Sequence, residues 1–302
     1  MTNMILDLKN VTKKFGQDLA LDDVSLTIFK GDIYGLIGRN GAGKTTLMKI
    51  ITDLIRKTSG TIFLLSDRPY SKNLERVGAI IEAPVAYVNL TAFQNLKILC
   101  KQKGIKDYSV IQEALEFVNL TKTANKKFKH FSLGMKQRLG LAMALLNKPD
   151  FLILDEPING LDPIAIIEFR EILEKINRER NTTILISSHI LSELYQVSNR
   201  FGFIHNGKII EEISKEELDE KCASTTIIET KQINDLAVLL DKLQVNFKIT
   251  DDSHVVLPEN KLTISDLNNA IFEADIRIDE IRKNDENLED YYTNMLLKVG
   301  EN

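Results

Sequence analysis

The feature that most constrains this chain is a glycine-rich loop between two apolar segments. The loop, Gly38–Thr46, fits the pattern G-x-x-x-x-G-K-[ST]. A short apolar run before it, which includes Ile33, Leu36 and Ile37, predicts a buried strand, and residues 47–51 predict the start of a helix. Glycines let a backbone close tightly around an anion, and the following helix adds the positive end of its dipole. The loop therefore predicts a phosphate-binding site.

Individual residues of this loop have distinct expected roles. Lys44 would reach the β- and γ-phosphates of a nucleotide, and the Thr45 hydroxyl would bind Mg²⁺. The remaining loop residues would surround the phosphates with their backbone: Gly38, Arg39, Asn40, Gly41, Ala42, Gly43 and Thr46. The alternative is a glycine-rich turn that contains a lysine by chance. The strand and helix patterns on either side favour the nucleotide site.

A second element of such a site lies further along the chain. The apolar run 151–154 predicts a buried strand, and Asp155 and Glu156 follow it directly. A carboxylate at a strand end beside the loop can hold Mg²⁺, and its neighbour can orient or deprotonate an attacking water molecule. We therefore assign Asp155 to the metal and Glu156 to the water. A surface turn with two acidic residues is the alternative, and the preceding apolar residues disfavour it.

Length and composition set outer limits on function. A chain of 302 residues suggests two domains, or one large domain with an appendage. The net charge of −4 does not indicate a general nucleic-acid binder. Cys100 and Cys222 fit no metal-binding spacing, and we expect two buried thiols in a reducing compartment. No apolar run reaches the roughly 18 residues of a membrane-spanning helix, so a membrane role would require a partner.

The pattern of apolar residues divides the chain in two. Strand patterns up to about residue 83 give way to a helical period over about 91–120, and strands and helices then alternate as far as about residue 220. Beyond about residue 221 glycine is rare and no chemical motif occurs. This part predicts a βαββαβ unit and a last helix, with strands at 225–230, 245–250, 254–257 and 276–282 and helices at 234–243, 265–272 and 288–297.

Several further stretches occur in the order that one family shows. They are Phe131–Arg138, Asn159–Asp162 and the pair Ser188-His189, together with the loop and the acidic strand end described above. This ordered set, over about residues 4–220, resembles the ATP-binding subunit of ABC transporters. The resemblance implies an α/β fold: a P-loop NTPase core of ABC type with an antiparallel β subdomain and a helical insert at about 85–147. Residues 1–220 would form the ATP-binding domain, and 221–302 a small α+β domain that regulates or dimerises.

The resemblance also assigns site residues. Phe15 occupies the adenine-stacking position, and the alternative for it is a core phenylalanine. Ser132 and Gly134 occupy the signature that binds ATP on the opposite subunit, where Leu133 replaces the usual first glycine. Asp162 lies in the loop that crosses between subunits. His189 matches the histidine that contacts the γ-phosphate, so the catalytic set would be Lys44, Glu156 and His189.

Glu82 departs from the family pattern, which has glutamine at this position to bind Mg²⁺ and sense the membrane partner. A glutamate also offers oxygens to Mg²⁺, but when ionised it cannot donate a hydrogen bond. Together with Arg39 and the Ser-Leu-Gly-Met signature, Glu82 resembles the bacterial exporters of lantibiotic immunity and bacitracin resistance. That resemblance implies export of a peptide antibiotic. Neutral drift at a tolerant position is the alternative.

The family resemblance implies an ATPase that uses ATP and Mg²⁺ and drives a separate integral membrane permease. It would work as a homodimer, or paired with another ATPase subunit, peripheral to the cytoplasmic face of a bacterial membrane. The alternative is a soluble ABC-type ATPase that acts on nucleic acid or ribosomes. Members acting on chromosomes carry a long coiled coil, for which the interval here is too short, and ribosome-acting members usually join two ATPase halves. A small-molecule kinase would leave the Ser132 helix and His189 unexplained.

Overall fold

A computed structural model of the chain describes residues 4–65, 70–223, 225–258, 264–284 and 287–300. The chain forms two compact units, one up to Lys215 and one from Glu216 onward. The sequence placed the boundary at 220/221. In the structure, the contacts between residues divide the chain at the start of helix α8 (Lys215–Lys221). The sequence analysis places this helix in the first unit.

The first unit is built on a six-stranded sheet. Its strands, in spatial order, are β5 (Val77–Ile80), β6 (Phe151–Leu154), β7 (Thr183–Ser188), β3 (Ile33–Ile37), β8 (Arg200–His205) and β9 (Lys208–Ser214). All neighbouring pairs are parallel except β8–β9. Strands β3, β6 and β7 are buried along their whole length, as expected for parallel strands covered on both faces. Their carboxyl ends meet at one edge, where ligands of such sheets bind.

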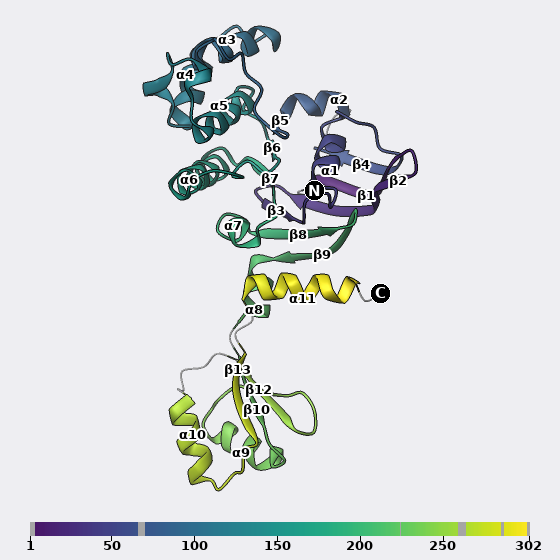
Figure 1. Ribbon diagram of the computed structural model, residues 1–302, viewed down its shortest axis with the longest axis vertical. Coiled ribbons are helices and arrows are strands. Elements are labelled where there is room, and N and C mark those ends of the chain that lie inside the picture. Colours follow the sequence, from purple (N-terminus) through teal and green to yellow (C-terminus); the bar gives the residue numbers. More distant parts are fainter. Residues whose placement is uncertain (1–3, 66–69, 224, 259–263, 285–286, 301–302) are drawn as a thin grey trace. The chain divides into compact units, whose positions relative to one another are not determined.

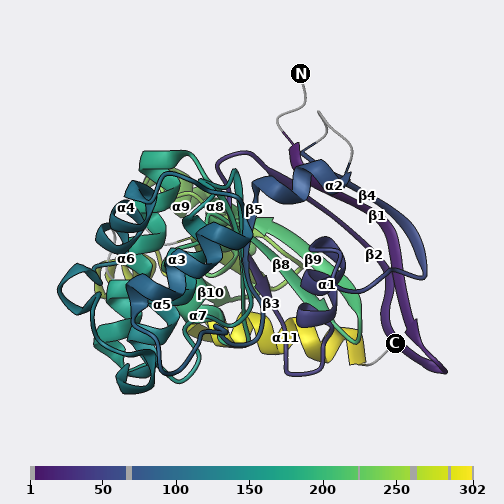
Figure 2. The same cartoon turned by 90° about the horizontal axis from the view of Figure 1, so that it is seen from above.

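A three-stranded antiparallel sheet packs beside the phosphate-loop helix α1 (Lys44–Ile51). It has the order β2 (Asp18–Phe29), β1 (Met4–Phe15) and β4 (Ser59–Leu64). Strands β1 and β2 are longer than their alternating segments predicted, because their polar ends also pair in a hairpin. Leu8, Leu26 and Leu47 belong to the core that joins this sheet to α1. Figures 1 and 2 show the small sheet on one side of the unit.

Helices α3 (Ala92–Gln102), α4 (Ser109–Phe117) and α5 (Leu133–Leu145) occupy the opposite side (Figures 1 and 2). Thr91 begins α3 with a capping box, because it exchanges hydrogen bonds with Gln94. The remaining helices of this unit are α2 (Tyr70–Asn73), α6 (Pro163–Arg180) and α7 (Leu191–Tyr195). Within the described segments, every helix is too short or too polar to cross a membrane.

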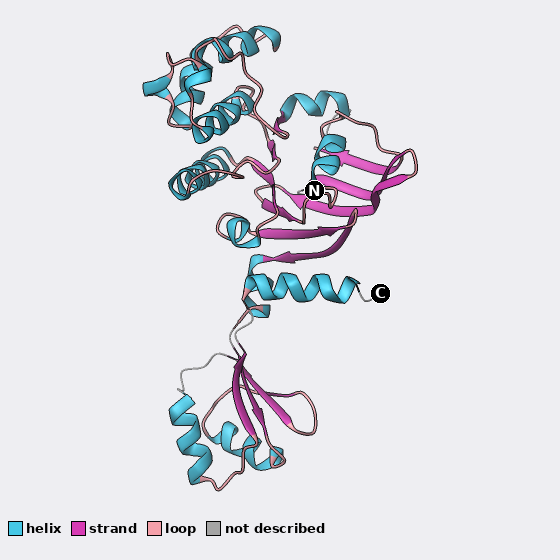
Figure 3. Cartoon of the chain, in the orientation of Figure 1, coloured by secondary structure: helices cyan, strands magenta, loops and turns pink. Residues whose placement is uncertain are grey.

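The second unit contains a four-stranded antiparallel sheet with two helices packed against it (Figure 3). After α8, its described elements are β10 (Thr225–Glu229), α9 (Ile233–Lys242), β11 (Lys248–Ile249), β12 (His254–Pro258), α10 (Ile264–Glu273), β13 (Glu280–Asn284) and α11 (Leu288–Gly300). The strands have the order β11-β12-β10-β13. Ile228 and Val255 from the sheet share a core with Leu236 of α9 and Ile271 of α10.

Two strand predictions in this unit were wrong for the same reason. The predicted strand 245–250 is only the two-residue β11, and the predicted strand 276–282 begins at Glu280. Val245 and Ile276 instead complete helix ends: their N–H groups donate to Leu240 and Ile271, after left-handed residues. This is a Schellman motif, in which an apolar residue packs back on its helix. In this protein the left-handed positions are occupied by Gln and Asp. The glycine that usually marks such a helix end is therefore missing from the sequence.

The two cysteines differ in burial. Cys100 in α3 is buried, and burial raises the pKa of its thiol. Cys222 is only half-buried, so the expectation of two buried thiols was wrong for this residue. It lies directly after α8, where the last turn leaves it partly accessible.

Candidate active site

The loop between β3 and α1 forms a hollow of about 160 Å³ at the carboxyl edge of the parallel sheet. The hollow is lined by Ala20, Asn40, Gly41, Gly43, Lys44, Thr45, Thr46 and Glu156. Gly43 caps α1 with a φ of 112°, and a Cβ at this position would lie 2.8 Å from Leu21 Cδ2. Only glycine fits both demands. Helix α1 begins at Lys44, earlier than the apolar pattern predicted, so its N-terminus opens directly onto the hollow.

Lys44 is held inside the loop rather than in solvent. Only 4% of its side chain is exposed, and its Nζ donates to the Gly38 carbonyl at 2.6 Å and the Arg39 carbonyl at 3.2 Å. The same Nζ lies 3.1 Å from Glu156 Oε1. A lysine restrained in this way presents a fixed positive charge to an anion in the hollow.

Thr45 and Asp155 meet at the start of α1. Thr45 Oγ1 donates to Asp155 Oδ2 at 2.7 Å, and Ser187 Oγ donates to Asp155 Oδ1 at 2.8 Å. The Ser187 hydroxyl in turn accepts the Glu156 N–H at 3.0 Å. Ser187 was missed by the sequence analysis, and its only signal was its place at the end of a buried strand, next to Ser188-His189. These adjoining oxygen atoms are the donor type that Mg²⁺ prefers.

Glu156 is positioned by its backbone and by two side chains. Its φ of 44° is in the left-handed region, which is uncommon for a non-glycine residue and frequent at functional sites. Its Oε2 lies 3.2 Å from His189 Nδ1 and accepts from Asn159 Nδ2 at 3.3 Å. The structure thus brings together the predicted residues Lys44, Glu156 and His189 around one carboxylate.

Phe15 ends strand β1 at the tip of the β1–β2 hairpin. It is 49% exposed, which argues against the core-phenylalanine alternative. The Lys13 ammonium lies 4.6 Å from the ring centroid. An exposed ring of this kind is available for stacking on a flat ligand.

Ser132, Gly134 and Asp162 do not line the phosphate hollow. Ser132 caps α5 by accepting the Met135 N–H at 3.3 Å, and Asp162 caps α6 by accepting the Ala165 N–H at 2.9 Å. The two helix starts are in contact, because a Cβ on Gly134 would lie 3.2 Å from that of Ala165. In one chain, therefore, these residues are a separate group from the Lys44 site.

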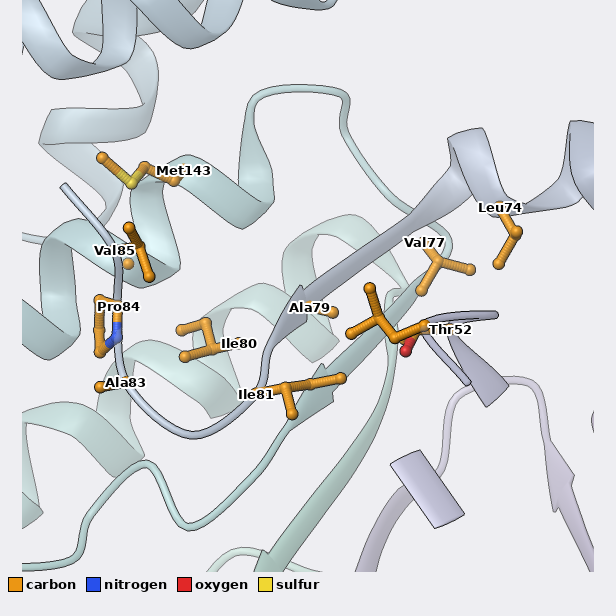
Figure 4. A pocket seen from close by; sticks show the side chains of 12 residues that line it. Thr52, Leu74, Val77, Ala79, Ile80, Ile81, Ala83, Pro84, Val85 and Met143 are labelled. Atoms are coloured by element: carbon orange, nitrogen blue, oxygen red, sulfur yellow. The ribbon is translucent and has the colours of Figure 1, made fainter. Parts of the chain in front are cut away.

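Glu82 also lies outside the phosphate hollow. It follows β5, and its carboxylate forms an ion pair with Lys49 of α1. Beside it runs a groove of about 440 Å³ (Figure 4). The groove is lined by Thr52, Leu54, Leu74, Val77, Ala79, Ile80, Ile81, Ala83, Pro84, Val85, Gly140 and Met143. Its walls come from β5, the loop that follows β5, α5, the segment after α1 and the short turn that precedes β5.

The strand–loop–helix cradle, the buried lysine and the paired carboxylates define a nucleoside triphosphate hydrolase of the P-loop class. The family model described as "ABC transporter" matches residues 21–159. The bacitracin transport ATP-binding protein of Enterococcus faecalis is 39% identical over 300 residues, 97% of this chain and 96% of that protein. A lantibiotic transport ATP-binding protein of Streptococcus pyogenes is 48% identical over 206 residues, 68% of this chain and 89% of that protein.

Solved structures agree with these relatives. A dimeric ATP-binding cassette bound to ADP and phosphate has 27% identity and a TM-score of 0.62, over 70% of this chain and 98% of that one. The chain belongs to the ABC transporter family and is an ATP-binding, ATP-hydrolysing subunit. The predicted family, fold class and ATPase activity are confirmed, and the nucleic-acid or ribosome alternative is not favoured. ABC ATP-binding subunits work as dimers with a membrane permease.

Proposed function

We propose that this subunit powers the export of a peptide antibiotic through a separate membrane permease and so confers resistance or immunity. The observation that carries the proposal is the similarity to a bacitracin transport ATP-binding protein, which extends over 300 residues and therefore through the second unit. The chain would work at the cytoplasmic face of a bacterial membrane.

The geometry around the hollow supports the catalytic roles that the motif and the family resemblance assign. The loop Gly38–Thr46 binds the phosphates, Lys44 holds the γ-phosphate, and Phe15 stacks on the adenine. Glu156 orients the attacking water, and His189, within hydrogen-bonding distance of that carboxylate, contacts the γ-phosphate. Because Lys44 and Glu156 are in contact beside the hollow, both can reach one phosphoryl group bound there.

Mg²⁺ fits the donor set of this site. Thr45 and Asp155 place two oxygen atoms 2.7 Å apart beside the phosphate hollow, and Ser187 holds the carboxylate in place. Thr45, Asp155 and Glu82 would hold the ion, which supplies positive charge to the phosphates when it is bound. Asp155 is buried, so its position does not depend on solvent.

Complete sites require a second subunit. We assign the signature residues Ser132 and Gly134, at the start of α5, to ATP held by the other copy's loop. Asp162 would lie in the crossing between the two copies. Residues from 216 onward would regulate or stabilise this dimer.

The groove beside Glu82 would receive the permease, because its lining is mainly apolar and it adjoins a predicted metal ligand.

The test is a resistance measurement in a sensitive bacterium. The chain is expressed together with the membrane permease that co-purifies with it from its native host, and growth is measured in bacitracin and in a lantibiotic. Resistance to either compound that is abolished by Glu156→Gln supports the proposal. Resistance that survives this substitution, or ATPase activity without co-purification of the permease, contradicts it.

A further inference from the structure

Lys49 and Glu82 form an ion pair between helix α1 and the loop that follows β5. The side chains are 31% and 65% exposed, respectively. Exposed ion pairs contribute little to stability, because water screens them and two long side chains must be ordered. This pair can therefore exchange for another partner without unfolding the loop.

Lys49 lies one helical turn beyond Thr45. Residues four apart on a helix have Cβ atoms about 5–6 Å apart on the same face. Thr45 contacts Asp155, and the Asp155 N–H donates to the Ile80 carbonyl at 2.8 Å. The loop that carries Glu82 is thereby attached at its base to the backbone of Asp155, the residue whose carboxylate is the proposed metal ligand. Glu82 thus pairs with the face of α1 that also carries Thr45, and its carboxylate contacts Lys49.

The backbone at Glu82 can transmit a change in the partner of the Glu82 carboxylate to the groove wall. Glu82 has a φ of 65°, which is uncommon for a residue with a side chain. Pro84, two residues on, packs so closely on α5 that a Cβ added to Gly140 would lie 2.7 Å from Pro84 Cγ. Ala83, Pro84 and Val85 also form part of the groove wall (Figure 4). Movement of Glu82 would alter this wall and its contact with α5.

We infer that Lys49 is a positioning residue that competes with Mg²⁺ for the Glu82 carboxylate. Before nucleotide binds, Lys49 holds Glu82 away from the metal position, and nucleotide binding with Mg²⁺ separates the pair. The inference rests on the metal role proposed above for Glu82. The inference predicts an unusual direction of effect. The positive charge of Lys49 weakens the binding of Mg²⁺ and ATP, although lysines near phosphates ordinarily strengthen that binding.

Equilibrium binding of a fluorescent ATP analogue to the full-length chain tests whether Lys49 weakens the affinity for the nucleotide. Lys49→Met, Glu82→Gln, Glu82→Ala and the Lys49→Met/Glu82→Gln double variant are each compared with the parent, once with Mg²⁺ and once with EDTA. The matched control is Lys122→Met, which removes an exposed lysine from the turn 121–123. Thermal unfolding of each variant checks that it folds.

With Mg²⁺, Lys49→Met is expected to tighten binding about two- to five-fold, the equivalent of one exposed ion pair. With EDTA, and in the Glu82→Gln background, Lys49→Met should not increase the affinity for the ATP analogue. Lys122→Met should not change this affinity in any condition. Weaker binding of Lys49→Met with Mg²⁺ would overturn the inference, as would equal tightening without Glu82. If Glu82→Ala, which removes the side-chain oxygen atoms, leaves the Mg²⁺ dependence unchanged, the metal role of Glu82 and this inference fail together, while Glu156-dependent hydrolysis and transport still stand.

Discussion

Lys44 and Glu156 face each other across the phosphate hollow, with 3.1 Å between Nζ and Oε1. The cation proposed to hold the γ-phosphate and the carboxylate proposed to activate water thus neutralise one another before ATP arrives. We expect the phosphates to take over Lys44, which frees one oxygen of Glu156 for water. His189 contacts the other oxygen and keeps the carboxylate in place during this exchange.

Replacing Glu156 by glutamine should separate binding from hydrolysis. The amide keeps the shape of the side chain but cannot accept a proton, and general-base catalysis contributes about 100- to 10,000-fold. We expect the rate of phosphate release to fall at least about 100-fold, with ATP affinity retained and an ATP-dependent dimer detectable by gel filtration. The control is Glu174→Gln, an exposed residue of α6. Turnover of Glu156→Gln at the parent rate would exclude Glu156 as the main base.

Replacing Lys44 by methionine should affect binding itself. The substitution removes the charge-assisted contact to the phosphates, and such hydrogen bonds are worth about 1.5–3 kcal/mol, or about 10- to 150-fold in affinity. The measurement is titration with ATP by calorimetry. The variant also frees Glu156 in the empty site, so ATP binding should no longer require separation of the pair. Unchanged affinity would show that Lys44 does not contact the nucleotide.

Phe15→Ala should weaken ATP binding without destabilising the fold, because the ring is half-exposed. Aromatic stacking adds about 0.5–1.5 kcal/mol beyond area burial, so we expect a loss of about three- to ten-fold. Phe63→Ala is a close control: Phe63 is 53% exposed, and Lys9 lies over its ring as Lys13 lies over Phe15. Equal losses of affinity in both variants would count against adenine stacking at Phe15.

The thiols should react with iodoacetamide at very different rates. Burial raises the pKa of Cys100, so at mildly alkaline pH less of it is thiolate, the reactive form, and the folded structure also blocks access. Cys222 is half-buried and should be labelled in the native protein, as followed by peptide mass spectrometry. Cys222→Ser should then remain unlabelled until denaturant is added. Native labelling of Cys100 at the rate of Cys222 would contradict the described packing of α3.

The P-loop, the acidic strand end and the helix at Ser132 could be predicted because each is encoded in consecutive residues. Gly38–Thr46 and Asp155-Glu156 follow apolar strands, and Ser132 begins a helix. Side chains that join distant segments could not be predicted. Ser187 acts across two strands, and Lys49 reaches a loop 33 residues away. Their roles depend on sheet order and helix orientation, which single-sequence patterns do not contain.

The place of β5 in the sheet has a consequence for how such subunits diversify. Among the described strands, β5 is at the margin and pairs with β6 alone, whereas β6 and β7, which lead into Asp155 and His189, are flanked on both sides. A change in the loop after β5 disturbs one ladder of hydrogen bonds and leaves the interior strands in register. Substitutions at position 82, such as the glutamate found here, therefore leave the strands that position Asp155 and His189 in place, and the loop after β5 can vary more freely than the ends of β6 and β7.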